Sequence, residues 1–506
     1  MNAPAAPAWE IDGARRFFIT LASVLATTLM AVDLTIASVA LPQIQGALSA
    51  TADQVSWVLT SYAIALAVAT PVVGPLAERV GRKRLFLLAV AGFTLASLLC
   101  GLAGSLEAIV LFRLLKGAFA AALVPISQAV LMDSYPPDRQ GEAMAWWTIG
   151  VMVGPIIGPL VGGSLTDALS WRWIFFVNLP FGVLAYVAIA AFLPRDPPGA
   201  VRPFDRFGFA VLTLGLATLQ FVLDRGERAA WFDSAVITGL ALAAAAFLWV
   251  FAAHSRFAAR PFIPRELFAD RNFTACLLLT FVTSGVFYAN LSLTAPMLQS
   301  ILGYPARETG LMLAPRGVGV LAGVACANLL RRRVADRTLI LAGLAGAAAS
   351  IAAVATFSLQ VGIRTVVEVG TVQGFFYGMM FVPLTTATFA TLAPALRTDG
   401  AALVQLVRQL SGGIGVAVTF ALLKRGTDGG VLVLSARVDP AAPGWQAALE
   451  AAGEAAPAVL ADEVHRQAAM LAYLDIAAWM AVGLVIILPL VLSLRGGART
   501  GPPAPP

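Results

Sequence analysis

A single carboxylate, Asp33, lies near the middle of a long apolar run close to the start of the chain. The run covers residues 18–42 and is long enough to cross a bilayer, which takes about 20 apolar residues. A carboxylate at that depth is costly, so it is usually paired, protonated or part of an ion pathway. Asp33 could therefore take up and release a proton inside the membrane. The alternative is a carboxylate held permanently in an ion pair between two helices.

Arg113 is a base that could pair with Asp33. The two residues lie about nine and about six positions from the same-side ends of their apolar runs, so at about 1.5 Å per residue their depths agree within one helical turn. An ion pair between them is therefore geometrically allowed. Lys116 follows one turn further along the same run. Its side chain could extend to the membrane surface or face a cavity, and the sequence leaves its role open.

The composition places these residues in a protein that crosses a membrane many times. Only 12% of the 506 residues are charged and 59% are hydrophobic, with a mean hydropathy of +0.83, whereas soluble domains carry about 25% charged residues. The net charge of +6 does not indicate nucleic-acid binding, because the basic residues are scattered among short loops. The three cysteines lie in apolar runs without the spacing of metal ligands or of a disulfide framework.

Fourteen membrane-length runs predict an all-α polytopic protein. They lie at about 18–42, 56–76, 84–104, 107–131, 143–165, 173–193, 207–224, 235–253, 273–297, 310–330, 338–357, 364–392, 403–423 and 473–494. An even number places both termini on one side, and the excess of Lys and Arg on that side predicts that it is the cytoplasm. A weak similarity between the basic loops 78–86 and 332–340 favours two six-helix halves with two helices inserted between them.

This arrangement predicts five parts of the chain. They are a cytoplasmic tail (1–17), an N-terminal six-helix bundle (18–193), two inserted transmembrane helices with linkers (194–272), a C-terminal six-helix bundle (273–494) that includes an outer loop (424–472), and a cytoplasmic tail (495–506). Within the outer loop, the spacing of Asp462, Glu463 and Arg466 predicts a short amphipathic helix.

The loop after the second run carries a distinctive motif. It begins at Gly74 and continues Pro-Leu-Ala-Glu78-Arg79-Val-Gly81-Arg82-Lys-Arg. The two glycines permit a tight turn between helices, and Glu78 and Arg82 could form ion pairs that hold helix ends in one of two arrangements. The alternative is a basic loop that only sets orientation. The motif resembles the signature between helices 2 and 3 of the major facilitator superfamily, with Glu78 where Asp is usual.

The fifth run carries glycines at intervals of four. They are Gly150, Gly154, Gly158 and Gly162, and Pro155 lies among them. A stripe of small residues lets a neighbouring helix approach closely, and close packing alone is the simpler explanation. The combination of glycines and proline resembles the antiporter signature of exporter branches of the superfamily.

Several further segments narrow the resemblance. Residues 34–42, 171–180, 223–226 and 382–386 look like the EmrB/QacA type of drug–proton antiporter, and the last two look most like its EmrB branch. The match extends over residues 18–494. The resemblance implies export driven by proton entry, with Asp33 and Arg113 in the places of the family's first-helix acid and fourth-helix arginine. Lys116 departs from a position that is often neutral in the family.

Five polar residues of the second half could line a substrate cavity. They are Asn290, Arg316, Gln373, Gln405 and Arg408. Each one alone is more often part of the packing than of a pocket. Bases outnumber acids in the deep parts of the runs, so neutral or anionic amphiphiles suit this region better than dications. The tryptophans of residues 171–180 are typical of the membrane–water interface.

Together these features predict a proton-coupled exporter of amphiphilic drugs or toxic compounds that works by alternating access in a bacterial inner membrane. The alternative is a dedicated exporter or importer of one metabolite on the same fold. The runs contain no cluster typical of an active site and no nucleotide-binding loop, so we expect a transporter without a cofactor rather than an enzyme. The expected partners are amphiphilic substrates, protons and the lipid bilayer. The EmrB likeness adds a periplasmic adaptor and an outer-membrane channel.

Overall fold

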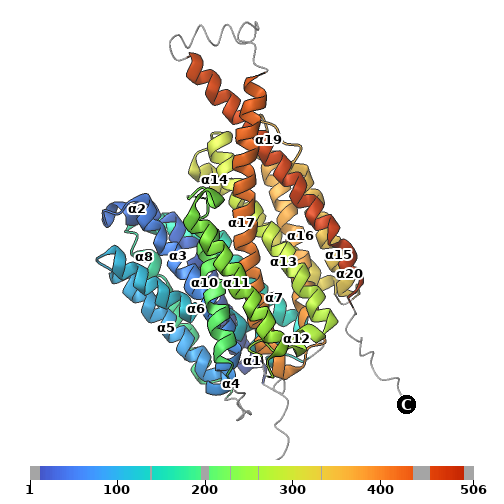
Figure 1. The fold of residues 1–506 in the computed structure, drawn as a ribbon. Helices are drawn as coiled ribbons and strands as arrows, with labels where there is room; N and C mark the ends of the chain where they lie inside the picture. The colour runs from blue at the N-terminus through green and yellow to red at the C-terminus, as the bar shows by residue number, and fades with distance from the viewer. Residues whose placement is uncertain are drawn as a thin grey trace, which may run out of the picture.

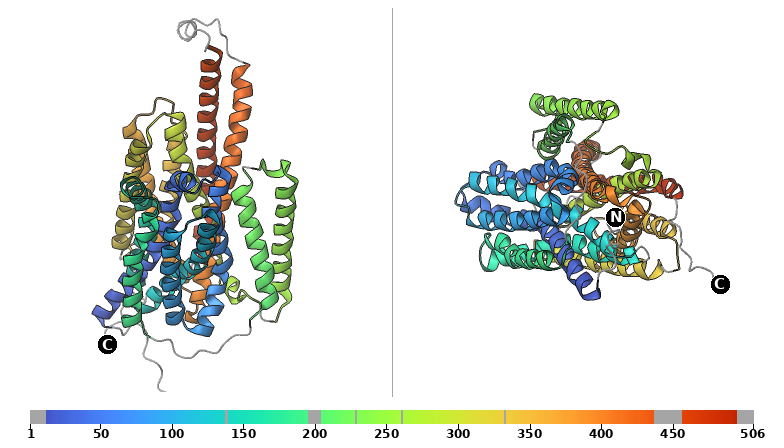
Figure 2. Two further views of the ribbon diagram at one scale, coloured as in Figure 1. Left: turned by 90° about the vertical axis from the view of Figure 1, so that its left-hand side faces the viewer. Right: turned by 90° about the horizontal axis from the view of Figure 1, so that it is seen from below.

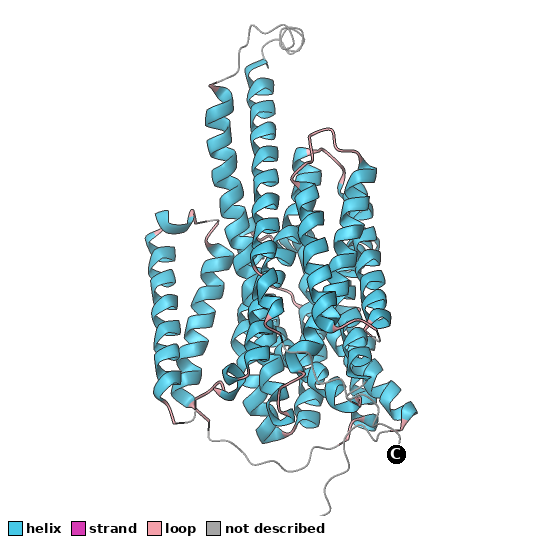
Figure 3. Cartoon of the chain, turned by 90° about the vertical axis from the view of Figure 1, so that its right-hand side faces the viewer, coloured by secondary structure: helices cyan, strands magenta, loops and turns pink. Residues whose placement is uncertain are grey.

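The computed structural model describes residues 12–136, 139–194, 204–227, 229–259, 261–331, 333–436 and 456–494. Throughout these ranges the chain forms helices and their connections, with no strand (Figure 3). The bilayer core offers no water to the backbone, so a helix, which satisfies its own N–H and C=O groups, is the expected spanning element. The predicted all-α fold is confirmed.

The number of long helices agrees with the predicted arrangement of six, two and six. Thirteen helices of the described residues are long and apolar enough to cross a membrane, and α7 (Gln140–Ala168) is a further helix of 29 residues. Helix α1 (Gly13–Val39) begins within the predicted N-terminal tail. Residues 1–11 of that tail and the predicted tail 495–506 lie outside the described residues.

The N-terminal half is a bundle whose helices are separated by short turns. Its other helices are α2 (Leu41–Ala47), α3 (Ala52–Ala69), α4 (Val73–Val80), α5 (Arg82–Leu102), α6 (Leu106–Ser134), α8 (Trp173–Phe176) and α9 (Asn178–Phe192). Thr51 and Gln54 form a capping box at the start of α3, and the Ser105 hydroxyl caps α6. Gly81 ends α4 and precedes α5 with a φ of +90°, a conformation that favours glycine.

Two inserted helices form a hairpin beside this bundle (Figure 2). They are α10 (Arg206–Arg225) and α11 (Ala235–Phe257). Helix α10 packs against α3, where the Thr60 hydroxyl donates to Asp224 and the Arg225 guanidinium lies 4.6 Å from the centre of the Trp57 ring. Helix α11 is largely exposed on the surface of the molecule, as expected for an apolar helix that faces lipid.

The C-terminal half has the same kind of helical bundle. Its helices are α12 (Glu266–Ala269), α13 (Arg271–Pro296), α14 (Ala306–Leu330), α15 (Asp336–Val354), α16 (Ile363–Phe389), α17 (Arg397–Ser435), α19 (Ala456–Ile486) and α20 (Leu488–Leu492). A π-helical turn, Met297–Ile301, extends α13.

The described parts of segment 424–472 are helical rather than the predicted outer loop. Helix α17 continues to Ser435 and α19 begins at Ala456, and the two project beyond the rest of the bundle (Figure 1). Asp462, Glu463 and Arg466 lie on α19, so their predicted short helix is part of a long one. A Cβ at Gly430 would lie 3.0 Å from the Cβ of Ala468, so small residues let the two helices pack closely. Residues 437–455 lie outside the described residues.

The two ends of the bundle differ. We call the end that carries Arg82, Lys83, Arg84 and Arg331 the basic end, and the end toward which α17 and α19 project the opposite end. One cluster of buried apolar side chains joins the halves, and its C-terminal-half members include Phe273, Val324, Phe389 and Leu403. These four positions lie in the parts of α13, α14, α16 and α17 nearest the basic end. The halves are therefore packed together at the basic end.

Candidate functional site

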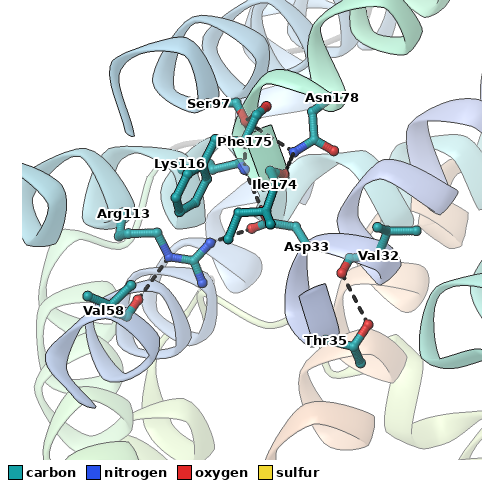
Figure 4. A network of polar contacts seen from close by, with 10 residues as sticks. All are labelled: Val32, Asp33, Thr35, Val58, Ser97, Arg113, Lys116, Ile174, Phe175 and Asn178. Atoms are coloured by element: carbon teal, nitrogen blue, oxygen red, sulfur yellow. Dashed lines mark hydrogen bonds and ion pairs between the residues drawn. The ribbon is translucent and has the colours of Figure 1, made fainter. Parts of the chain in front are cut away.

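Asp33 lies in the interior of the N-terminal half, between two bases (Figure 4). Arg113 Nη1 donates to Asp33 Oδ2 at 2.7 Å, and Lys116 Nζ donates to Asp33 Oδ1. The three side chains are at most 1% exposed. The ion pair that the depths of Asp33 and Arg113 allow is thus present. Lys116, whose role the sequence leaves open, contacts the same carboxylate.

Helix α6 brings both bases to one face because residues three apart on a helix are neighbours. Arg113 Nε donates to the Val58 carbonyl at 2.8 Å, and the guanidinium lies 4.2 Å from the centre of the Tyr62 ring. A side chain at Gly117 would overlap the Tyr62 carbonyl, so this glycine lets α6 approach α3. Close helix packing thereby fixes the position of the guanidinium.

A second set of polar groups holds Lys116. Its ammonium donates to Ser97 Oγ at 2.9 Å and lies 5.2 Å from the centre of the Phe175 ring. Ser97 Oγ donates to the Phe175 carbonyl and accepts from Asn178 Nδ2 at 3.1 Å (Figure 4). The sequence analysis missed Ser97, Phe175 and Asn178. Phe175 and Asn178 are three positions apart in a helical segment, a spacing that could have indicated a shared inward face.

The tryptophans of residues 171–180 do not share one environment. Trp173 is 45% exposed, whereas Trp171 is 4% exposed and packs edge-to-face on Phe175. The interfacial interpretation therefore fits Trp173 and is wrong for Trp171. This segment serves the interior network as well as the surface.

The charges of this network stabilise the ionised form of Asp33. A carboxylate between two cations carries favourable Coulomb interactions that strengthen in a low-dielectric interior. Protonating Asp33 in this arrangement would leave Arg113 and Lys116 buried without a counter-charge, which is strongly unfavourable. Proton uptake at Asp33 therefore requires that at least one of the bases move away, or that water or another anion reach it.

The glycines of α7 form a seam with α1. A side chain at Gly154 or Gly158 would overlap Ala31 or Thr35. The Thr35 hydroxyl donates to the Gly154 carbonyl at 3.1 Å. At the ends of the seam, Gly150 lies against Val24, and a Cβ at Gly162 would lie 2.8 Å from Cγ1 of Ile36. The seam holds the helix that carries Asp33. The side chain of Pro155 lies outside the described residues.

The motif after the second run is not the predicted loop: residues 74–80 belong to α4, Gly81 makes the turn and α5 begins at Arg82. The motif lies at the basic end and contacts the other half. Arg82 Nη1 donates to one oxygen of Asp133 at 2.6 Å, and Arg397 Nη1 donates to the other oxygen at 2.5 Å. Asp133 lies in the last turn of α6 and Arg397 begins α17, so one carboxylate joins the two halves. A side chain at Gly74 would overlap Asp399 of α17. The sequence analysis missed both Asp133 and Arg397.

Two other residues of the motif have separate surroundings. The Arg79 guanidinium lies 5.0 Å from the centre of the Phe204 ring, which precedes the inserted helix α10. Glu78 is half-buried on α4. Gly81 supplies the turn described above, so the motif combines one turn residue with contacts to three parts of the chain.

The five polar residues predicted for a cavity in the second half do not lie together. Asn290, Arg316 and Gln373 line one cavity inside the C-terminal bundle. Gln405 and Arg408 are buried on α17 and are not part of its lining. The Arg408 guanidinium lies 4.8 Å from the centre of the Phe381 ring and 5.3 Å from that of Trp147, at the contact between the halves.

The family model described as Major Facilitator Superfamily matches residues 23–416. The chain belongs to the major facilitator superfamily. Among its relatives, the fatty acid resistance protein FarB of Neisseria gonorrhoeae is 36% identical over 419 residues, which cover 82% of each chain. The multidrug export protein EmrB of Escherichia coli strain K12 is 32% identical over 489 residues, which cover 94% of this chain and 95% of the relative. The predicted EmrB-type resemblance is confirmed.

Solved structures of the superfamily share the fold. The human organic anion transporter MFSD10 aligns with a TM-score of 0.59 at 14% identity, covering 94% of this chain and 98% of the other. The proton:xylose symporter XylE aligns with a TM-score of 0.61 at 14% identity, covering 94% and 96%. This superfamily consists of membrane transporters, so the chain is a multi-pass transporter protein rather than a catalytic enzyme.

Proposed function

We propose that this protein exports amphiphilic compounds across a bacterial inner membrane in exchange for protons, with both termini in the cytoplasm and without a cofactor. The observation that carries the proposal is the fully buried Asp33 between Arg113 and Lys116 in a chain related to proteins named for multidrug export and fatty acid resistance. A buried carboxylate with movable counter-charges is a group that can couple proton binding to helix movement.

Alternating access gives a role to the contacts at the basic end. With that end in the cytoplasm, the bonds of Asp133 to Arg82 and Arg397 hold the transporter closed toward the cytoplasm. Substrate entry from the cytoplasm then requires that these bonds break and that α17 move away from Gly74. Helix α6 carries Asp133 and also Arg113 and Lys116, the two partners of Asp33. Movement at the basic end is therefore transmitted through α6 to the Asp33 network.

The proton cycle follows from the same geometry. In the closed state Asp33 is ionised and pairs with both bases. When α1 and α6 shift, the carboxylate loses a partner and binds a proton that enters from the opposite side. Release of that proton to the cytoplasm restores the ion pairs. The two ion pairs therefore stabilise the closed state until a proton on the Asp33 carboxylate takes the place of one of the bases.

The projecting helices α17 and α19 support a further partner, a periplasmic adaptor that leads to an outer-membrane channel. Leu432 and Val433, in the last turn of α17, are 73% and 54% exposed, and Leu471 of α19 is 50% exposed. We propose that these side chains contact the adaptor. Replacing Leu432 and Val433 by Ser is expected to reduce export from cells while leaving proton coupling in vesicles intact. Unchanged export from cells would contradict the adaptor contact.

Proton release from inside-out vesicles tests the central part of the proposal. The lumen is acidified, amphiphilic compounds of different charge are added outside, and the loss of the pH gradient is recorded. The wild type is expected to release protons when a substrate is added, and Asp33→Asn is expected to show none. Glu107→Gln is the matched control, because Glu107 is an exposed acid at the start of α6. Equal responses from wild type and Asp33→Asn would make Asp33 a purely structural ion-pair partner.

A response to a single compound, dependent on Asp33, would instead favour the dedicated transporter of one metabolite. The panel therefore includes single-chain acids, alcohols and quaternary amines of equal chain length, so that head-group charge is varied while apolar area is held constant.

A further inference from the structure

The C-terminal bundle encloses a cavity that lies within one half of the molecule rather than between the halves. Side chains from α13, α14, α15, α16 and α19 line it, and the space between them amounts to about 610 Å³ when the open solvent at its mouth is included. Ligand sites of this kind are typically apolar with a few convergent polar groups. The distribution of polar groups along the cavity is therefore informative.

The polar groups gather at the deep end of the cavity. Arg316 and Gln373 each lie about ten residues, or about 15 Å, from the first residue of their helices at the opposite end. Asn290 reaches the same depth from α13, and its Oδ1 accepts from Arg316 Nη2 at 2.9 Å. This depth is near the centre of a bilayer core about 30 Å thick. A guanidinium there needs a compensating charge or water.

The described residues supply no such charge. Among them, no carboxylate forms an ion pair with Arg316, which is 6% exposed. Gln373 is 3% exposed, and its Nε2 has no hydrogen-bond partner within the described chain. Among the described residues at this end of the cavity, therefore, Arg316 is bonded to the neutral Asn290 amide but has no counter-charge, and Gln373 Nε2 has no acceptor. Because unpaired buried donors are unfavourable, an anion that accepts from both would be stabilised.

The remaining lining is apolar and adaptable. Between the polar cluster and the opposite end lie Leu293, Met297, Met312, Val366 and Met480. Methionine side chains are unbranched and polarisable, so they adjust to apolar groups of different shape. The cavity therefore has an anion-binding end and an apolar end along one axis.

We propose that this cavity binds a singly charged anionic amphiphile, with its acidic head group on Arg316 and Gln373 and its apolar chain among Met297, Met312 and Met480. A planar guanidinium binds a carboxylate or a phosphate through two parallel hydrogen bonds. The head group can therefore belong either to an exported acid or to an anionic phospholipid of the bilayer. The inference rests on the proposed export function only for the first of these sources.

Binding of dodecanoate to the purified full-length protein tests the proposal. The protein is placed in nanodiscs of neutral phosphatidylcholine, and calorimetry compares dodecanoate with dodecanol and with dodecyltrimethylammonium. Dodecanoate is expected to bind most tightly. Arg316→Gln is expected to weaken dodecanoate about tenfold or more, because a charge-assisted hydrogen bond is lost, and to leave dodecanol unchanged. An unchanged affinity for dodecanoate would overturn the proposal.

Two further variants keep the test decisive. Arg408→Gln removes a second buried arginine of the same half that lies outside the cavity, so its affinity for dodecanoate is expected to match the wild type. If Arg316→Gln does not fold, two other variants replace it: Gln373→Leu removes the second donor, and Met312→Trp fills the apolar end. Both are expected to weaken the binding of dodecanoate. Equal weakening by Arg408→Gln would place the anion elsewhere.

Phosphatidylglycerol distinguishes the two sources of the head group. If a bilayer lipid occupies the site, adding phosphatidylglycerol to the nanodiscs weakens dodecanoate binding to the wild type and has no such effect on Arg316→Gln. If the site serves an exported acid, phosphatidylglycerol has little effect, and dodecanoate evokes proton release in vesicles. Either result supports an anion site at Arg316.

Different results would contradict the anion site and the proposed export function. Proton release evoked by neutral or cationic compounds, without any binding of dodecanoate, would remove the anion site and leave the exporter. Binding of dodecanoate that depends on Arg316, without proton release by any compound, would leave the site and remove the exporter.

Discussion

The two halves of the molecule handle buried charge in opposite ways. In the N-terminal half, Asp33 is paired with Arg113 and Lys116 inside a network of hydrogen bonds. In the C-terminal half, Arg316 and Arg408 are equally buried, and within the described residues neither forms an ion pair with a carboxylate. A charge that is fully paired inside the protein responds to protons and helix movement. A charge without an internal counter-charge is available to an anionic ligand.

The surroundings of the two C-terminal arginines also differ. Both guanidinium groups contact aromatic rings, Arg316 that of Phe287 at 5.7 Å and Arg408 those of Trp147 and Phe381. Only Arg316 also lines a cavity with the unpartnered amide of Gln373. A cation on an aromatic face is partly compensated. The comparison therefore assigns proton binding to one half, anion binding to a cavity in the other half, and a structural role to Arg408 between them.

The largest expected effect comes from breaking the paired network. Asp33→Ala leaves two buried cations without a counter-charge and is expected to lower the free energy of unfolding by about 3–5 kcal/mol. Unfolding in mixed detergent micelles, followed by tryptophan fluorescence, measures the loss. The double variant Asp33→Ala with Lys116→Met is expected to recover part of the stability, since one of the unpaired cations is removed. Equal loss in the single and double variants would contradict the pairing argument.

Substitutions in the glycine seams are expected to lower the free energy of unfolding by less than Asp33→Ala does, and by similar amounts in both halves. Gly154 packs on α1, and Gly323 of α14 packs on the Phe375 carbonyl of α16. Alanine at either position forces two helices apart, with an expected loss of about 1–3 kcal/mol. Gly163→Ala is the control, because its Cβ would lie 3.8 Å from Val39. The same unfolding measurement applies, and a loss confined to one half would show that the seams are not equivalent.

Replacing Arg316, which has no counter-charge among the described residues, is expected to change the free energy of unfolding in the opposite direction. Arg316→Met takes this cation out of the interior, and it is expected to raise the free energy of unfolding by about 1 kcal/mol. The comparison with Asp33→Ala is direct, because both variants change one buried charge by one unit. A clear loss of stability on Arg316→Met would mean that the bond to Asn290 and the Phe287 ring already compensate the charge of Arg316, and would remove the contrast between the halves.

The contact between the halves at the basic end is expected to give the smallest effect. Asp133→Asn weakens the bonds to Arg82 and Arg397, which are partly exposed, so the expected change is up to about 1 kcal/mol. Spin labels at Arg84 and Arg337 (exposed positions at the start of α5 and α15) measure the distance between the halves. We expect a larger population of long distances in Asp133→Asn.

Arg364→Gln is the control for this measurement. It breaks an exposed ion pair with Glu368 inside a single helix, so the distance between the halves is expected to stay unchanged. An equal shift in both variants would show that the labels report general loosening rather than opening at the basic end.

Part of the site could be predicted from the sequence because depth in a membrane follows from position along a helix. This argument was sufficient for Asp33 and Arg113. It could not assign Lys116, since a lysine near a helix end can also extend to the surface, although its three-residue spacing from Arg113 indicates the same face. Asn178 was missed because it lies in an aromatic segment that is typical of the interface.

The sequence does not show how each helix is rotated about its own axis, and therefore which way its side chains point. Span limits place Arg316 and Arg408 about one and a half turns inside their runs, measured from opposite faces of the membrane, but the direction of each side chain depends on packing against neighbouring helices. Arg316 therefore lines a cavity, whereas Arg408 is packed between the rings of Trp147 and Phe381. The extension of α17 was missed for a different reason. Residues 424–435 are too polar for a span, yet they continue as a helix because small residues pack them against α19.

Proton release from inside-out vesicles, measured for dodecanoate and for dodecanol in Asp33→Asn and Arg316→Gln, tests the division between the halves most directly. The account predicts that Asp33→Asn abolishes proton release for both compounds, whereas Arg316→Gln abolishes it for dodecanoate and retains it for dodecanol. Loss of both responses in Arg316→Gln with a folded protein, or retention of either response in Asp33→Asn, would contradict it.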